Sequence, residues 1–551
     1  MRLRHLILVL IALAGIWVGV LVARTHGGST RAAFAAGPQP PDFPAPKLIH
    51  VAGLKRPVSS TPIVKVRRAP ELAAKHVRRH AAPKPKAKAH RKPHRHSDAT
   101  LTSGTQVVPD SARSYADAPP PPLDPLTISD AQVVSLTSSS ARVTWRTSVP
   151  AQAQTAFGLD APTVWTQPNG DSVIEHESVL TGLAFSTTYT VYLHAVDEWN
   201  RGVTQTLTFT TGPMLNASAA RTSGDQIWVD DEPFFPTAVW EQCSDMFGSN
   251  LADGINLFMG DGCENDGDLP SRLDGRAYSI VRAEDAANAD GRGVIGWYFP
   301  DEWDAFLKGS VKRTDLAKDI PDARPGRISF LTLTNHFYSR AAPLPAGKGM
   351  YPVLFTIPDV IGFDLYPLQV WCRPAFGDVL DAQHELHSLS GGKPTFQWIE
   401  VARMEHPCRN NPALDPTPQT VRAETWLSVA GGANGVGYFP NHWSPQIGTE
   451  IARTNRELKA LTQALLAPAA NASSDADVVR VSGRTLNGAL YVVAVNTSET
   501  TVQAKITVDG IAGRSATVLG SGQAIGADDQ GFTDTFGPLD ARVYTIPPAG
   551  W

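Results

Sequence analysis

Several common signatures of chemistry are missing from this chain of 551 residues. It holds only four cysteines and no Cys-x-x-Cys pair, which argues against a four-cysteine zinc site. Neither His-Glu-x-x-His nor His-x-x-Glu-His occurs, and these are ligand patterns of zinc hydrolases. A Gly-x-Ser-x-Gly elbow is also absent, which argues against a serine hydrolase. We therefore expect no metal and no cofactor.

Basic residues are scarce outside the first 97 residues. Those residues hold 19 Lys and Arg against two acids, a net charge of +17. The rest of the chain holds 30 basic and 51 acidic side chains, a net charge of −21. Proteins that bind nucleic acid carry their basic surface on the folded module. The acidic remainder argues against nucleic acid as a partner.

Residues 1–36 have the pattern of a targeting segment. Arg2 and Arg4 precede an uncharged apolar stretch of 18 residues, Leu6 to Ala23, just long enough to span a bilayer. We favour an uncleaved signal anchor, which would be a membrane partner. The alternative is a signal peptide cleaved near Ala33-Phe34-Ala35. Both predict an extracytoplasmic protein, either membrane-anchored or secreted.

Residues 37–122 contain almost no aromatic side chains and are rich in Pro, Ala, Lys, Arg and His. Such a composition cannot bury enough apolar surface to fold alone, so we expect a disordered linker. Its basic run, residues 65–95, would be attracted to the anionic cell envelope. Five histidines offer the alternative of a metal site, against which we favour a solvated spacer: His76, His80, His90, His94 and His96.

Residues 123–213 predict a small β-sandwich, because short alternating runs recur at sandwich spacing. The run Leu183-x-Phe185-x-Thr187-x-Tyr189 resembles the tyrosine corner of fibronectin type III domains, and Trp145 stands where that family has its core tryptophan. Phe185 replaces the usual Pro. The resemblance implies a spacer or binding module without chemistry.

Between residues 214 and 468, apolar runs alternate with helical patterns such as 421–430 and 449–466. Nearly continuous apolar runs are typical of parallel strands that are buried on both faces. Seven clear runs and one weak run, 278–281, predict an eight-stranded (β/α)8 barrel. A doubly wound sheet is the alternative, but no glycine-rich phosphate loop follows the first run. The expected strands are 234–240, 254–259, 278–281, 293–299, 328–333, 360–365, 395–399 and 435–439.

Residues 469–551 return to β-branched runs with Gly and Asn between them, which predict a C-terminal all-β sandwich. All four cysteines precede it, and an even count in an exported chain suggests disulfides. By proximity along the sequence we pair Cys243 with Cys263 and Cys372 with Cys408, although three connectivities are possible.

Carboxylates follow two of the expected barrel strands. Asp301-Glu302 follows the fourth, and Glu400 follows the seventh. This arrangement is similar to the large clan of retaining (β/α)8 glycoside hydrolases, over about 250 residues. Further matches are Phe235-Pro236, Gly254-Ile255-Asn256, Gly296-Trp297 and the glycine-rich segment 430–435. The resemblance implies that Glu302 is the acid/base, Glu400 the nucleophile and a carbohydrate the substrate.

Two carboxyl groups suit this chemistry because glycosidic cleavage needs an acid at the leaving oxygen and an anion on the other face of the ring. Burial beside tryptophans can raise the pKa of the acid. The clan has Asn before its acid/base Glu, whereas Asp301 stands here. Asp301 is therefore expected to bind substrate, with the alternative that it is the acid/base itself.

The other candidate substrate-binding residues lie at strand ends. The resemblance implies that Tyr366 bonds the nucleophile. Tryptophan rings stack on sugar C–H groups, and histidines bond hydroxyls, although ordinary packing is the alternative for each. These candidates are Trp240, Trp303, Trp443, His336 and His442. The rival functions are a catalytically inactive carbohydrate-binding barrel and an adhesive surface protein.

Overall fold

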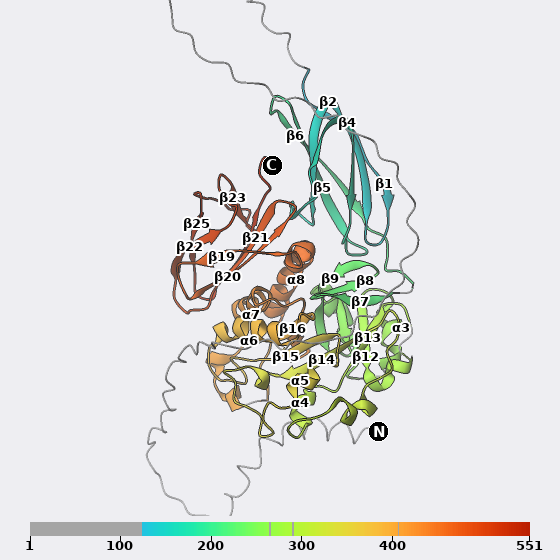
Figure 1. The fold of residues 1–551 in the computed structure, drawn as a ribbon, viewed down its shortest axis with the longest axis vertical. Coiled ribbons are helices and arrows are strands. Elements are labelled where there is room, and N and C mark those ends of the chain that lie inside the picture. Colours follow the sequence, from blue (N-terminus) through green and yellow to red (C-terminus); the bar gives the residue numbers. More distant parts are fainter. Residues whose placement is uncertain (1–123, 217, 264–265, 289–290, 406) are drawn as a thin grey trace, which may run out of the picture. The chain divides into compact units, whose positions relative to one another are not determined.

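The computed structural model describes residues 124–551, apart from 217, 264–265, 289–290 and 406 (Figure 1). The expected targeting segment and the basic linker lie outside the described residues. Among the described helices, none has the length and apolar character needed to cross a membrane.

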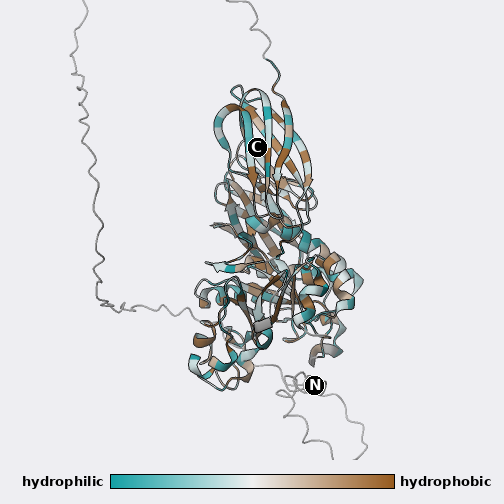
Figure 2. Cartoon of the chain, turned by 90° about the vertical axis from the view of Figure 1, so that its right-hand side faces the viewer, coloured by the Kyte–Doolittle hydropathy of each residue, from teal (hydrophilic) through white to brown (hydrophobic). Residues whose placement is uncertain are grey.

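Residues 128–210 form an antiparallel β-structure, as expected. The first half of the long strand β2 pairs with β1 and β4, and its second half pairs with β3 and β5, which continues to β6. Alternating brown and teal bands along these strands in Figure 2 reflect alternate burial of their side chains. The strands are β1 (Ile128–Leu136), β2 (Ala141–Gly158), β3 (Val164–Trp165), β4 (Asn169–Leu180), β5 (Thr188–Asp197) and β6 (Gly202–Thr210).

The core of this region contains Trp145 and Tyr189. The Tyr189 hydroxyl accepts a hydrogen bond from the Ala184 N–H at 2.9 Å, which is the contact of a tyrosine corner. The all-β architecture is thus confirmed, while membership of the fibronectin type III family stays a prediction.

A small antiparallel sheet precedes the barrel and was not expected. It consists of β7 (Ala220–Ser223), β8 (Gln226–Val229) and β9 (Glu232–Phe234). The expected first barrel strand, 234–240, was therefore too long, since Phe234 ends β9 and the barrel strand begins at Thr237. Pro236 separates the two strands because it has no N–H to continue a ladder.

Eight parallel strands close into a barrel, with β10 paired to both β11 and β17. The expected fold is confirmed here, and the weak run 278–281 is a full member, β12. The barrel strands are β10 (Thr237–Trp240), β11 (Leu257–Met259), β12 (Tyr278–Arg282), β13 (Val294–Tyr298), β14 (Ile328–Thr334), β15 (Val360–Asp364), β16 (Thr395–Glu400) and β17 (Val436–Phe439).

The helices around the barrel are short after the first strands and long after the last three. Side-chain oxygens of Thr417 and Ser444 cap the N-termini of α7 and α8. The α-helices are α2 (Phe247–Ala252), α3 (Leu269–Leu273), α4 (Trp303–Phe306), α5 (Tyr351–Leu354), α6 (Phe376–Leu389), α7 (Pro418–Ala430) and α8 (Pro445–Leu465). Single 3-10 turns are η1 (Ser244–Met246), η2 (Asp266–Asp268), η3 (Ala283–Asn288), η4 (Arg313–Asp315), η5 (Ala317–Asp319), η6 (Asn335–Phe337), η7 (Pro407–Asn410) and η8 (Pro412–Leu414).

The C-terminal region is all-β, as expected, with two antiparallel sheets around a common core. One sheet has the order β18-β20-β21-β26-β23-β24 and the other β19-β22-β25. The strands are β18 (Ala469–Ala470), β19 (Ala472–Ser474), β20 (Val479–Leu486), β21 (Ala489–Asn496), β22 (Val502–Val508), β23 (Ser515–Val518), β24 (Ala524–Gly526), β25 (Gly531–Phe536) and β26 (Ala541–Ile546).

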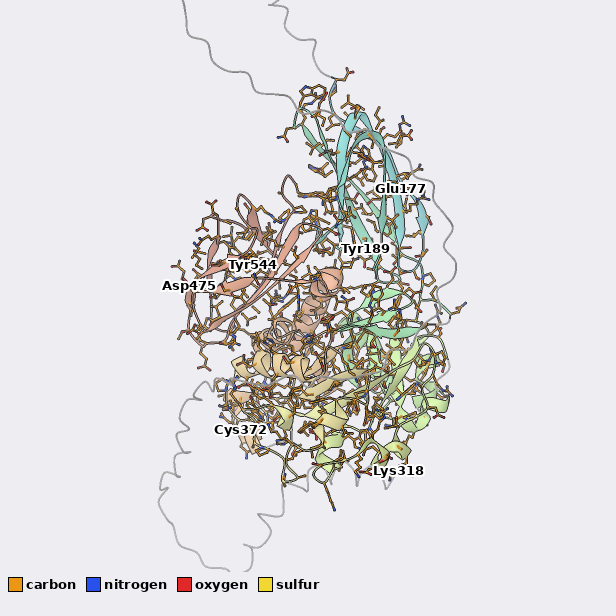
Figure 3. All side chains as sticks on the ribbon, in the orientation of Figure 1. Glu177, Tyr189, Lys318, Cys372, Asp475 and Tyr544 are labelled. Atoms are coloured by element: carbon orange, nitrogen blue, oxygen red, sulfur yellow. A yellow bond between two sulfur atoms is a disulfide. The ribbon has the colours of Figure 1, made fainter. Side chains whose placement is uncertain are left out.

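Both expected disulfides are confirmed, since Cys243 is bonded to Cys263 and Cys372 to Cys408. Each bond links the segments that follow two neighbouring barrel strands, β10 with β11 and β15 with β16 (Cys372 is labelled in Figure 3). The disulfides therefore tie together the loops at the carboxyl end of the barrel.

Candidate active site

The Asp301-Glu302 pair lies in the sharp turn between β13 and α4. Pro300, which has no N–H for a ladder, precedes it, and Glu302 has a left-handed backbone with φ of 46°. The Glu302 carbonyl accepts the N–H of Ala305 at 2.8 Å, which closes the turn. Asp301 is exposed and Glu302 is half-buried. Solvent therefore reaches both residues at the carboxyl end of the barrel.

Asp301, Glu302 and Asp364 form one electrostatic group. Protein atoms surround the two carboxyls of the turn on most sides even though solvent reaches the residues. This desolvation, with the negative charges of neighbouring carboxyls, raises the pKa of Asp301 to about 7 and that of Glu302 to about 8. Asp364, the last residue of β15, is buried, and its pKa is raised by desolvation and by the charges of Asp301 and Glu302. Carboxyls so coupled cannot all ionise together, so the group keeps a proton near neutral pH.

Tyr366 bonds Asp364 rather than Glu400. Its hydroxyl donates to Asp364 Oδ1 at 2.5 Å, which favours the charged form of that carboxyl. The Asn335 side chain donates to the Asp364 carbonyl at 2.9 Å and holds the same strand end. No hydrogen bond to the Glu302 carboxyl is found within the described part of the chain. The Tyr366 bond thus opposes, without reversing, the desolvation and the neighbouring charges that raise the pKa of Asp364 well above its usual value.

Glu241 follows β10 and extends the group. Arg282 Nη2 donates to Glu241 Oε1 at 2.8 Å, and the Tyr298 hydroxyl lies 3.4 Å from the same oxygen. Glu241 adds to the negative charge that raises the pKa of Asp301. The ion pair therefore lies beside the acidic turn. Arg282 could not be recognised from the sequence because its partner is 41 residues away.

Glu400 has a different environment. Its side chain is fully buried, and its two carboxyl oxygens accept the N–H groups of Leu368 at 2.7 Å and Gln369 at 2.8 Å. Burial raises the pKa of Glu400 to about 7. Its neighbouring acid is Glu424 of α7, itself fully buried, whose pKa is raised by desolvation and by the charge of Glu400. Because the two carboxyls are buried and repel each other when charged, they cannot both ionise near neutral pH.

The loop after β15 covers Glu400. The Gln369 side chain donates to the Leu414 carbonyl at 2.7 Å and accepts the Met404 N–H at 2.9 Å. These bonds and the Cys372–Cys408 disulfide hold the loop against the segment after β16. A substrate cannot reach Glu400 in this conformation.

The predicted sugar-contacting side chains have diverse settings. Trp240 is partly exposed and meets the Tyr298 and Trp398 rings edge to face. Trp303 is buried and stacks on Phe299, whereas the Trp443 indole donates to Asp253 at 2.9 Å. His336 bonds the Ala342 carbonyl, and His442 is exposed. The roles of all five in binding stay predictions; Trp240 combines partial exposure with a ring contact to Tyr298, whose hydroxyl lies 3.4 Å from Glu241.

Among the described residues, no three His, Cys, Asp or Glu side chains are arranged to hold a metal ion.

Two acidic residues of the barrel, Asp304 and Glu424, were not predicted from the sequence. Asp304 was visible as the third acid of Asp301-Glu302-Trp303-Asp304. Glu424 lies in a helical run that also holds Arg422, Thr425 and Ser428, so the sequence offered no clear sign of a buried acid.

No family model and no curated protein match the chain. Solved structures that it resembles include glycoside hydrolases. The GH30 endoxylanase of Clostridium papyrosolvens is 13% identical with a TM-score of 0.38, covering 60% of this chain and 98% of that one. Alpha-galactosidase I of Mortierella vinacea is 11% identical with a TM-score of 0.38, covering 57% and 98%. A β-glucuronidase of Ruminococcus gnavus is 9% identical with a TM-score of 0.31, covering 60% and 67%. At such identities and TM-scores the likenesses carry no argument about function, which depends on this chain's own residues.

Proposed function

We propose that the chain is a glycoside hydrolase that uses Glu302 as its general acid. The observation that carries this proposal is the coupled group Asp301, Glu302 and Asp364 at the carboxyl end of a closed parallel barrel. This is the end of such a barrel at which loops bring catalytic side chains together. An acid with a pKa of about 8 is protonated at neutral pH and can donate to a leaving oxygen.

The second carboxyl of the reaction is proposed to be Asp364, of whose surface 9% is exposed whereas Glu400 has no exposed surface. Its negative form is supported by the Tyr366 hydroxyl, and its charge interacts with that of Glu302. An anion here would stabilise the oxocarbenium-like transition state or activate the attacking group. The predicted pair of Glu302 and Glu400, acting with retention, stays an alternative. It requires the covering loop to expose Glu400.

The proposed substrate is a polysaccharide or glycoconjugate outside the cytoplasm. Trp240 offers a partly exposed ring beside the acidic group. The two disulfides fit an oxidising compartment. The expected N-terminal anchor and basic linker would keep the barrel near an anionic envelope.

Leaving-group dependence tests the acid. The purified protein is assayed on a panel of alkyl glycosides and dinitrophenyl glycosides. Glu302→Gln should lose activity on alkyl glycosides, whose leaving oxygen needs a proton, and keep most activity on dinitrophenyl glycosides, whose leaving group departs without one. Equal loss on both classes would remove Glu302 from the acid role. If Asp301→Asn gives this selective loss instead, Asp301 is the acid.

A second candidate function is a carbohydrate-binding barrel without catalysis. The burial of Glu400 favours it, since one of the two predicted catalytic acids is closed off. Absence of turnover across the panel, together with measurable binding of an oligosaccharide by calorimetry, would support this candidate.

A further inference from the structure

Asp304 is a buried acid two residues after Glu302 that the proposed reaction does not use directly. It lies in α4 and has no exposed surface. Within the described residues no basic side chain forms an ion pair with it. A carboxyl that is buried without a cation needs hydrogen-bond donors.

Three donors converge on Asp304. The Thr334 N–H donates to Oδ1 at 3.0 Å, and the Thr334 hydroxyl donates to Oδ2. The Tyr351 hydroxyl donates to Oδ2 at 2.7 Å. Tyr351 stays a donor because burial and the charge of Asp304 raise the pKa of its phenol. Three donors favour the charged form of the carboxyl, against the desolvation that raises its pKa.

The contacts of Asp304 also fix the turn. Thr334 ends β14, and Tyr351 begins α5. Asp304 therefore fastens the segment after β13 to the next strand and to a later helix. Glu302 needs such support, because a left-handed backbone is unfavourable for a residue with a side chain.

We propose, on the basis of the proposed function, that Asp304 is the positioning residue of Glu302. It anchors the turn that presents Glu302, and its buried negative charge adds to the desolvation and to the charge of Asp301, which together keep Glu302 in the protonated, acidic form. The other charged or titratable groups that face this site are Asp301 from the same turn, Asp364 and Tyr366 from β15 and its loop, Tyr351 from α5, and Glu241 with Arg282 from the ends of β10 and β12.

The test is a pH titration of Glu302 by infrared difference spectroscopy on the whole protein. The carboxylic-acid band that is lost in Glu302→Gln identifies the residue. In Asp304→Asn the titration midpoint of Glu302 should move to lower pH, by up to about one unit, because the variant removes one of the negative charges that oppose ionisation of Glu302. The alkaline limb of the pH–activity profile should also move to lower pH.

Asp359→Asn is the matched control. Asp359 accepts the N–H and the hydroxyl of Ser329 at 2.9 and 2.8 Å, before β15 rather than after β13. The Asp359→Asn variant loses similar hydrogen bonds away from Glu302 and should leave the titration midpoint of Glu302 unchanged. If Asp304→Asn does not fold, Tyr351→Phe removes one donor and should give a smaller shift in the same direction.

An unchanged Glu302 midpoint in both Asp304→Asn and Tyr351→Phe would overturn the proposal, as would an equal shift in Asp359→Asn. A shifted midpoint in a protein without glycosidase activity would instead refute the proposed function and leave the role of Asp304 intact.

Discussion

Glu302 and Glu400 follow strands of the same barrel but have different surroundings. Glu302 is half-buried in a turn with a left-handed backbone, beside two other carboxyls that repel its charge. Glu400 is fully buried, and two backbone N–H groups hold its oxygens. Both have a raised pKa, but only one is within reach of a substrate. A raised pKa alone therefore does not separate a catalytic acid from a structural one.

The largest expected effect is on catalysis in Glu302→Gln. Loss of a general acid lowers kcat/KM on unactivated glycosides by roughly 10² to 10⁴-fold. Steady-state kinetics on alkyl glycosides measures it. Glu385→Gln on α6 is the control and should retain activity, because among the described residues Glu385 accepts only the Ser339 N–H and hydroxyl. Full activity of Glu302→Gln would show that Glu302 is not the catalytic acid.

Glu400→Leu should act on stability rather than chemistry. It leaves the Leu368 and Gln369 N–H groups buried without acceptors, which costs about 2–4 kcal/mol of unfolding free energy. Thermal and urea unfolding measure this loss. The milder Glu400→Gln keeps one acceptor and should retain kcat within about tenfold. A folded Glu400→Gln protein without turnover would show that the covering loop opens and that Glu400 is catalytic.

Stability should fall as pH rises. The pKa values of Glu302, Asp301 and Glu400, about 8, 7 and 7, all lie above the values of the unfolded chain. Between roughly pH 4 and pH 8 the folded chain therefore binds more protons than the unfolded chain. The free energy of unfolding decreases as pH rises across that window. Calorimetry should show Tm falling by several degrees from pH 5 to pH 8. The slope should be smaller in Glu302→Gln, and an unchanged slope would mean that Glu302 does not titrate there.

The smallest expected effect is that of Trp240→Ala. Loss of a stacking ring should raise KM for the best substrate of the panel by about tenfold, equivalent to about 1.4 kcal/mol, with kcat less affected. Trp443→Ala is the control for Trp240→Ala. This variant should leave KM unchanged, because the Trp443 indole is already hydrogen-bonded to Asp253. A larger effect of Trp443→Ala on KM would place the sugar near the end of β17 rather than near the end of β10.

The barrel was predictable because its strands are buried apolar runs whose period and length appear in the sequence. The disulfides were predicted from proximity along the sequence, and the structure supplies the physical reason, since loops after neighbouring parallel strands meet at one end. The surroundings of Glu400 were not predictable from the sequence. Its partners are backbone N–H groups 31 and 32 residues earlier and an acid on a later helix. The same holds for Arg282 and Glu241, whose pairing depends on barrel closure rather than on local sequence.

Asp364, rather than Glu400, is proposed to act with Glu302. This is tested by kcat/KM of Asp364→Asn and Glu400→Gln on one unactivated glycoside, corrected for the folded fraction. We expect a loss of about 10³-fold or more for Asp364→Asn and less than about tenfold for Glu400→Gln. The reverse order would contradict this proposal and return the nucleophile to Glu400.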